Sequence, residues 1–200
     1  LGRRAAELPG AITYAVIPHT PLAKKLAFYA LHIDPAKEII VHMPMQSTRD
    51  KLLGKGGLTE DLQQSQFLTR IRSALADVPF ARGLSNHMGS HLTQLPDRMH
   101  WLMGELKRQK YFYLDSRTSS SNRPRQAAAN KNVPYLKRDI FLDHDPSPAA
   151  IARAFASAIE IAKARGHAVI LAHPYPSTLS FLETALLDLH KQNIELATAS

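Results

Sequence analysis

Histidines and aspartates follow many of the short apolar runs in this chain of 200 residues. The residues in these positions are His19, His42, His87, Asp115, the group 143–145 and His173. Imidazole and carboxylate groups together suit a divalent metal such as zinc, and the same groups serve as general acids and bases. A catalytic zinc usually keeps three protein ligands and one open position for water. The pattern therefore favours metal-assisted hydrolysis.

Each of these residues also has a structural interpretation. A lone histidine at the end of a strand is commonly a hydrogen-bonded structural residue. Asp115 precedes Ser116 and could cap a turn, and residues 143–145 lie beside prolines, where aspartates often form loops. Turn chemistry does not easily explain the same residue types at the ends of several independent strands. The joint pattern favours the functional interpretation over the structural one.

The spacing of His87 and His91 allows a second arrangement. Two histidines four residues apart on a helix can chelate a metal. Gly89 between them argues against a regular helix, so a joint site remains the minor alternative. The chain has no G-x-S-x-G nucleophile motif and no phosphate-binding glycine loop, which leaves a serine hydrolase or a nucleotide enzyme unsupported.

Short β-rich runs alternate with helical patterns along the chain. Strands are predicted at 13–17, 39–42, 83–86, 111–114, 133–136, 140–142, 169–172 and 194–197. Helices are predicted from Pro21, over 67–78, through Pro96, at 125–131, from Pro148 to Gly166, and from Ser177 to Asn193. This alternation predicts an α/β fold, an irregular or incomplete (β/α) barrel with mainly parallel strands, as one domain over residues 1–200. Ligands bind at the C-terminal ends of such strands, so we expect the polar residues to converge on one rim.

Composition excludes several classes of protein. Hydrophobic residues make up 44% and charged residues 21% of the chain, which is typical of a globular protein. The absence of cysteine excludes disulfides, thiolate zinc sites and cysteine nucleophiles. No apolar run reaches the roughly 18 residues of a membrane-spanning helix, and no secretory signal is visible. The net charge is +8, but the basic residues are scattered without interleaved aromatics, so nucleic acid is not an expected partner. The oligomeric state is unknown from sequence.

Several motifs, in order along the chain, resemble the divergent polysaccharide deacetylase family. They are LPGAITYAVIPHTP (8–21), VHMPMQ (41–46), SNHMGSHLT (85–93), YFYLDSRTS (111–119), VPYLKRDIFLDHDP (133–146) and VILAHPYPSTL (169–179). The resemblance implies a distorted (β/α) barrel related to the carbohydrate-esterase deacetylases, which use a divalent metal, commonly zinc, to hydrolyse N- or O-acetyl groups. It also implies a polysaccharide or peptidoglycan-like glycan as substrate, and a periplasmic or extracytoplasmic location.

The resemblance also implies roles for individual residues. His42 and His87 would bind the metal, and His173 would be the general acid. Asp115 would orient a catalytic histidine or bind substrate. Arg117 would stabilise an oxyanion or hold an acidic substrate group. His19 is assigned to substrate binding.

The family pattern normally begins with a strand that ends in an Asp-Asp pair, just before the segment that matches Leu1-Gly2. That pair would supply a metal ligand and the base. We expect this first strand in the natural protein, because removing a central strand would expose a sheet edge. The expected function is metal-dependent deacetylation of polysaccharide in the bacterial envelope. The alternative is a non-catalytic envelope protein that binds a glycan or a partner on the same fold.

Overall fold

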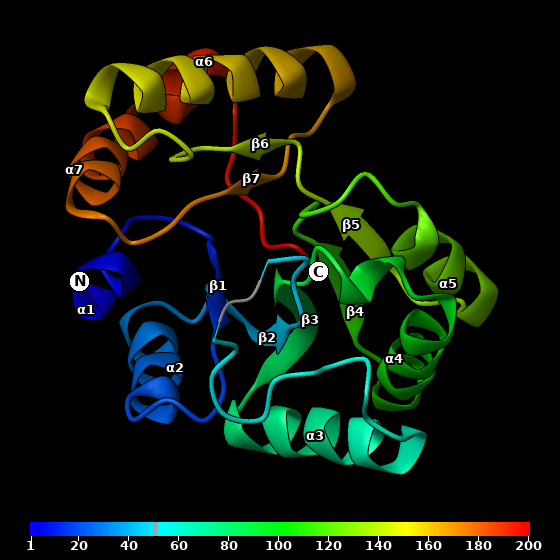
Figure 1. The fold of residues 1–200 in the computed structure, drawn as a ribbon. Coiled ribbons are helices and arrows are strands. Elements are labelled where there is room, and N and C mark those ends of the chain that lie inside the picture. Colours follow the sequence, from blue (N-terminus) through cyan, green and yellow to red (C-terminus); the bar gives the residue numbers. More distant parts are fainter. Residues whose placement is uncertain (50–51) are drawn as a thin grey trace. The chain divides into compact units, whose positions relative to one another are not determined.

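The computed structural model describes residues 1–49 and 52–200, and the chain forms two compact units (Figure 1). The first unit contains residues 1–12, 29–37 and 138–198, and the second contains 13–28, 38–137 and 199–200. Strands alternate with helices, and all the strand pairs between described residues are parallel. The predicted α/β class with mainly parallel strands is therefore confirmed. The assignment of residues 1–200 to one domain stays a prediction.

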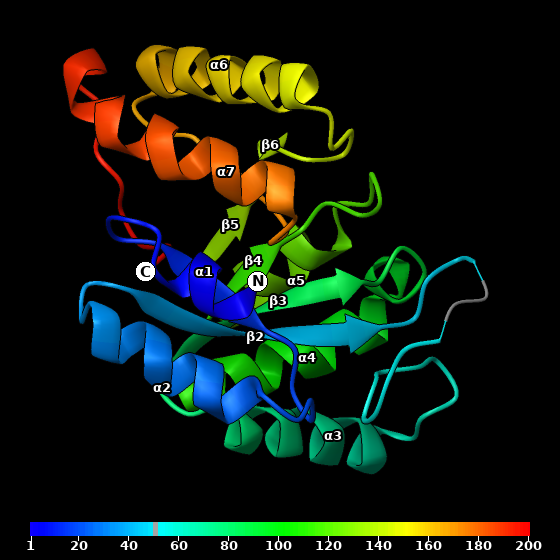
Figure 2. The same cartoon turned by 90° about the vertical axis from the view of Figure 1, so that its left-hand side faces the viewer.

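The second unit is built on a five-stranded parallel sheet whose strands lie side by side in chain order. These strands are β1 (Thr13–Val16), β2 (Glu38–Met45), β3 (Ala81–Met88), β4 (Phe112–Asp115) and β5 (Tyr135–Lys137). Figure 2 shows β2 and β3, the two longest strands, running in the same direction. Because the strands are parallel, their C-terminal ends lie at the same edge of this sheet.

Helices follow the strands of this unit. They are α2 (Ala23–Ile33), whose residues from Tyr29 onward belong to the first unit, α3 (Gln64–Asp77), the 3₁₀ turn η1 (Leu92–Gln94), α4 (Pro96–Gln109) and α5 (Arg123–Lys131). A reciprocal capping box between Gln63 and Gln66 starts α3, which buries Phe67 and Ile71 on its apolar face. Pro96 occupies the first turn of α4, where its missing N–H costs no helical hydrogen bond.

Strand β2 continues through Pro44 to Met45, beyond the predicted range 39–42. The physical reason is that β1 pairs with β2 only as far as Val41. The carbonyl of Pro44 accepts a hydrogen bond from the N–H of Leu58 at 2.8 Å. The missing N–H of Pro44 therefore faces the side that β1 has already left, and the ladder to β3 loses no bond.

The first unit holds a two-stranded parallel sheet and its own helices. These elements are α1 (Gly2–Ala6), β6 (Ile140–Phe141), α6 (Pro148–Arg165), β7 (Ile170–Leu171), α7 (Pro176–Ala185) and the 3₁₀ segment η2 (Leu186–Gln192). Ile151, Phe155 and Ile159 lie four residues apart on α6, so they share one face. They form an apolar core with Leu142 and Leu189.

The predicted limits of α6 are confirmed. Ser147 is its N-cap residue and Pro148 its first residue, while Gly166 ends it in the left-handed conformation, at φ 81°. The last helix begins one residue before Ser177, and Asn193 ends its 3₁₀ continuation at φ 56°.

Two predicted strands differ from the structure. The strand expected at 169–172 is ordered as a ladder only at Ile170–Leu171. The strand expected at 194–197 does not form. Instead, Ile194 and Leu196 pack against the apolar core of the first unit, and Leu196 also lies against Gly10. These apolar side chains are partly buried without a strand partner, which alternation of residue types cannot reveal.

No helix in the part of the chain that the structure describes combines the length and the apolar character needed to cross a membrane.

Candidate functional site

His42 and His87 form a pair of imidazoles on neighbouring strands of the five-stranded sheet. Their ring centroids are 5.0 Å apart, and the ring planes are inclined by 65°. Nδ1 of His42 lies 2.7 Å from the hydroxyl oxygen of Ser85. Both histidine side chains are half-buried. The structure therefore brings together the two residues predicted as metal ligands.

The strand register explains this pairing. His42 on β2 lies opposite Ser85 on β3, and His87 follows Ser85 by two residues. Because side chains alternate between the faces of a strand, His42, Ser85 and His87 share one face. His42 and His87 are then diagonal neighbours, within reach of each other across the ladder.

This pair fits two positions of a zinc site. A ligating histidine usually bonds its second ring nitrogen to an oxygen, which fixes the ring and its tautomer. When His42 donates from Nδ1 to Ser85, its Nε2 keeps a lone pair for a metal. Among residues 1–49 and 52–200, no three His, Cys, Asp or Glu side chains gather as a metal site. The pair alone supplies two of the three ligands that a catalytic zinc normally takes.

Asn86 lies between the strand ends on the opposite, buried face of β3 and was not singled out from the sequence. Its Oδ1 accepts hydrogen bonds from the hydroxyl of Tyr113 (3.0 Å) and the N–H of Ser116 (2.9 Å). Its Nδ2 donates to the carbonyl of Met88 (2.7 Å) and the hydroxyl of Thr118 (3.2 Å). All four hydrogen-bonding positions of the amide are thus used. Asn86 fixes the end of β3, next to His87, to the loop after β4.

Asp115 is held in that same region by two hydrogen bonds. Its Oδ1 accepts from the backbone N–H of Arg117 at 2.7 Å, and its Oδ2 accepts from the hydroxyl of Tyr135 at 2.8 Å. Burial of Tyr135, together with this hydrogen bond, raises the pKa of the tyrosine well above its usual value. Arg117 has a left-handed backbone, at φ 54°, and its guanidinium donates to the carbonyl of Ser121. These two hydrogen bonds come from Arg117 and Tyr135 and not from a histidine, and the predicted role of Asp115 stays a prediction.

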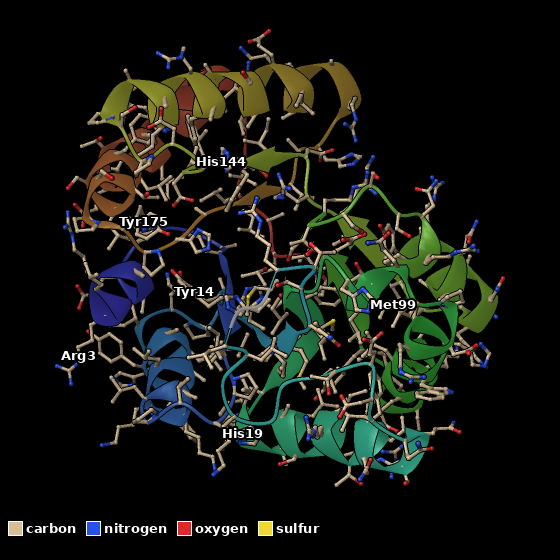
Figure 3. All side chains as sticks on the ribbon, viewed as in Figure 1. Arg3, Tyr14, His19, Met99, His144 and Tyr175 are labelled. Atoms are coloured by element: carbon tan, nitrogen blue, oxygen red, sulfur yellow. The ribbon has the colours of Figure 1, made fainter. Side chains whose placement is uncertain are left out.

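His19 lies in the turn after β1, beside α3 (Figure 3). Its backbone N–H donates to Oδ2 of Asp77 at 2.6 Å, and its ring lies 3.7 Å from the same carboxylate. Its Nε2 is 3.5 Å from the hydroxyl of Ser73. These contacts attach the turn to the end of α3, and substrate binding by His19 stays a prediction.

His91 has a different partner from His87. Its Nε2 lies 2.7 Å from Oε2 of Glu60. Met88 and Gly89 have positive φ values of 56° and 91°, so the chain turns out of the strand and forms no helix between the two histidines. The alternative site made of His87 and His91 on one helix is not present.

His173, the predicted general acid, is held by Asp143 in the first unit. Nδ1 of His173 lies 3.1 Å from Oδ1 of Asp143, and the backbone N–H of His173 donates to Oδ2 at 2.6 Å. The hydroxyl of Thr178 also donates to Oδ2, at 2.9 Å. The carboxylate is fully buried, whereas the His173 side chain is 36% exposed. Nε2 of His173 is therefore the ring nitrogen left for other partners.

Electrostatics keep Asp143 ionised. Burial by itself would raise its pKa, but the hydrogen bonds from His173 and Thr178 outweigh burial and lower the pKa. A buried carboxylate on one imidazole nitrogen fixes the orientation and the tautomer of the ring. Asp143 therefore holds Nδ1 of His173 in place and directs the other ring nitrogen away from the carboxylate.

The pairing of Asp143 with His173 follows from register and was missed in the sequence. Phe141 on β6 pairs with Leu171 on β7. Asp143 and His173 each lie two residues further on, so the two side chains leave the ladder side by side. The equal offset after the two apolar runs was the signal that could have identified Asp143 as the partner of His173.

Parallel strands with imidazole and carboxylate groups at their C-terminal ends define an α/β protein that carries polar groups where ligands bind in such folds. The chain belongs to the divergent polysaccharide deacetylase family, whose model matches residues 1–200. The resemblance seen in the sequence motifs is thereby confirmed.

Two relatives match most of the chain. YibQ of Escherichia coli strain K12, described as an uncharacterized protein, is 33% identical over 193 residues, which are 96% of this chain and 60% of YibQ. An uncharacterized protein of Haemophilus influenzae strain Rd is 35% identical over 182 residues, 91% of this chain and 64% of that protein. The chain therefore spans less than two thirds of the length of these relatives.

Solved structures share the fold at low sequence identity. The uncharacterized protein ATU2773 from Agrobacterium tumefaciens C58 superposes with a TM-score of 0.93 at 17% identity, over 98% of this chain and 81% of that one. BA3943 of Bacillus anthracis, described as a CE4 family pseudoenzyme, superposes with a TM-score of 0.51 at 13% identity, over 100% of this chain and 60% of that one. A BA3943 mutant described as having restored enzymatic activity gives a TM-score of 0.52 at 13% identity, over 100% of this chain and 62% of that one.

Proposed function

We propose that this protein is a metal-dependent hydrolase that removes acetyl groups from a polysaccharide or a peptidoglycan-like glycan of the bacterial envelope. The observation that carries the proposal is the pairing of His42 with His87 in a chain of a deacetylase family. A periplasmic location is part of the same proposal and rests on the family alone.

In this proposal His42 and His87 would hold a zinc or similar ion, together with a further ligand that the family resemblance implies is an aspartate. The chemistry that such an ion supplies is polarisation of the acetyl carbonyl and a lower pKa, about 7, for its bound water. His42 is positioned for this task by Ser85, which holds its Nδ1.

His173 acts as the general acid. Asp143 holds Nδ1, so the proton for the leaving amine or alkoxide comes from Nε2. By the same resemblance, a carboxylate of the whole protein would take the proton of the attacking water. Asp115 orients a catalytic histidine or binds substrate, and Arg117 stabilises an oxyanion or holds an acidic substrate group. His19 binds substrate.

The first test is metal content, measured by elemental analysis on the natural full-length protein. We expect about one ion per chain in the wild type and loss of that ion in both His42→Ala and His87→Ala. His91→Ala is the matched control, because His91 bonds to Glu60 and should keep the metal. Equal metal content in all four proteins would refute the assignment of the ligands.

The second test separates the acid from the ligands. His173→Ala should reduce acetyl release by roughly 10²–10⁴-fold while metal content stays unchanged. Equal loss of metal and turnover would show that His173 is not the acid.

The alternative function is a non-catalytic envelope protein that binds a glycan or a partner. One observation favours it: the fold is shared with BA3943, which is described as a pseudoenzyme. Bound glycan without acetyl release from any acetylated oligosaccharide, in a preparation that holds its metal, would support this alternative.

A further inference from the structure

His173 lies within a row of aromatic rings in the first unit. The edge of Phe141 meets His173, with centroids 5.2 Å apart and planes inclined by 64°. The ring of Tyr175 stacks with that of His173, with centroids 5.3 Å apart and planes inclined by only 27°. His144 lies 5.9 Å from Phe141. Figure 3 shows His144 in the loop after β6 and Tyr175 just before α7.

The chain holds Tyr175 rigidly. Pro174 and Pro176 flank it, and proline restricts both its own φ and the residue before it. The backbone N–H of Tyr175 donates to the carbonyl of His173 at 2.8 Å, and Tyr175 is the N-cap residue of α7. A ring with a fixed backbone loses little conformational entropy when a ligand packs on it.

This rigid ring is also exposed. Tyr175 is 44% accessible to solvent, although it lies one residue from a proline and two from the proposed acid. Stacked rings whose centroids are 5.3 Å apart are offset, so His173 covers only part of the tyrosine. An apolar face with a polar hydroxyl at its edge is the surface that a sugar ring, with C–H groups on its faces and hydroxyls around its rim, can complement.

We propose that Tyr175 binds a pyranose ring of the glycan, next to the sugar whose acetyl group is removed at His173. This inference rests on the proposed function for the class of ligand, and it adds a binding residue for a neighbouring sugar. Tyr175 stacks beside His173, and Nδ1 of the histidine is occupied by Asp143. The sugar that packs on Tyr175 is therefore the one next to the reacting sugar in the glycan, and binding affinity should increase with the length of the glycan.

The test compares a series of N-acetylglucosamine oligomers, from the monomer to the pentamer, in titrations with the natural full-length protein. In Tyr175→Ala we expect binding of the pentamer to weaken on the order of tenfold, and binding of the monomer to change less than about twofold. Tyr175→Phe keeps the ring and should stay within about twofold of the wild type for both. Phe28→Ala is the matched control, because Phe28 is an aromatic residue 54% exposed on α2.

Several results would overturn the inference. They are no binding of the pentamer to the wild type, an unchanged affinity in Tyr175→Ala, or an equal loss for monomer and pentamer. Thermal unfolding of each variant checks that the fold is intact. Weaker pentamer binding in Tyr175→Phe as well as in Tyr175→Ala would also overturn the inference, because the aromatic ring is kept in Tyr175→Phe.

Turnover is measured separately, on a small acetyl ester and on the acetylated pentamer. Pentamer binding that depends on Tyr175 without any turnover would leave the inference standing and refute the catalytic part of the proposed function. If kcat/KM for both substrates is the same in Tyr175→Ala and the wild type, the proposed function stands and the inference is refuted.

Discussion

At the scale of single residues, the two histidine sites are held by different kinds of partner. His42 bonds to a serine hydroxyl, which is neutral, whereas His173 bonds to a buried carboxylate whose pKa is lowered. A neutral hydroxyl suits an imidazole whose other nitrogen binds a metal, and a buried carboxylate suits an imidazole that must be held in one orientation and tautomer for proton transfer. The partners thus match the separate roles proposed for the two histidines.

Replacing Asp143 tests this division of roles. Asp143→Asn keeps the shape of the side chain but removes the charge and one acceptor at the His173 ring. We expect kcat for acetyl release to fall by roughly 10²–10⁴-fold, with metal content unchanged. Asp145→Asn is the control, since Asp145 bonds to the backbone of Ser147 in an exposed loop. Equal kcat in Asp143→Asn and the wild type would contradict the proposed orientation of His173.

At the scale of elements, helix ends and strand ends decide where the polar groups lie. The left-handed residues Gly166 and Lys110 end α6 and α4, and each lets the chain turn back toward the next strand. Strand β2 continues through Pro44 because the neighbouring strand has already ended. Small backbone features of this kind set the lengths of the strands that carry the histidines.

Two glycines show whether backbone conformation or lack of space for a side chain determines the effect of a Gly→Ala substitution on stability. Neither Gly166 nor Gly104 has an atom within 4 Å of the position that a Cβ would take, but only Gly166 has a positive φ, at 81°. Gly166→Ala should therefore destabilise the protein by about 1 kcal/mol. Gly104→Ala, inside α4, should stabilise it by about 0.5–1 kcal/mol. Urea unfolding measures both, and changes of the same sign would contradict this account.

At the scale of the whole molecule, charge dominates the response to acid. The net charge is +8 at neutral pH and rises as carboxylates become protonated, so repulsion within the chain grows on acidification. Glu105 on α4 is a buried carboxylate that resists protonation. Burial alone would raise its pKa, but hydrogen bonds from Arg108, Arg72 and Gln109 lower the pKa to about 2.

Glu105 should therefore contribute to acid denaturation. Its pKa is lower in the folded chain than the ordinary value of 4.5, so its stabilisation is complete above pH 4.5 and is lost as the pH falls toward 2. The full contribution is up to about 3 kcal/mol. Glu105→Gln should be less stable at pH 7 and should show a flatter loss of stability between pH 4.5 and 2. Unfolding curves measured across this range check the prediction, and parallel curves for the two proteins would contradict it.

The sequence by itself determined the class of fold, the family and the strand-end positions of the polar residues. Periodicity and helix-stop residues depend on local backbone preferences, so they predicted the parallel α/β arrangement and the ends of α6. The motifs around His42, His87 and His173 were sufficient to identify the family.

Only the tertiary structure decided which of these residues meet. Strand register places His42 beside His87 and Asp143 beside His173, and register depends on contacts between segments far apart in the sequence. The same is true of Asn86, whose four hydrogen bonds come from three different segments of the chain. It is true of Leu196 as well, which packs against the apolar core of the first unit instead of joining a sheet. Local sequence patterns place such residues at strand ends but do not select their partners, because burial and hydrogen bonding between distant segments decide which strands pair and in which register.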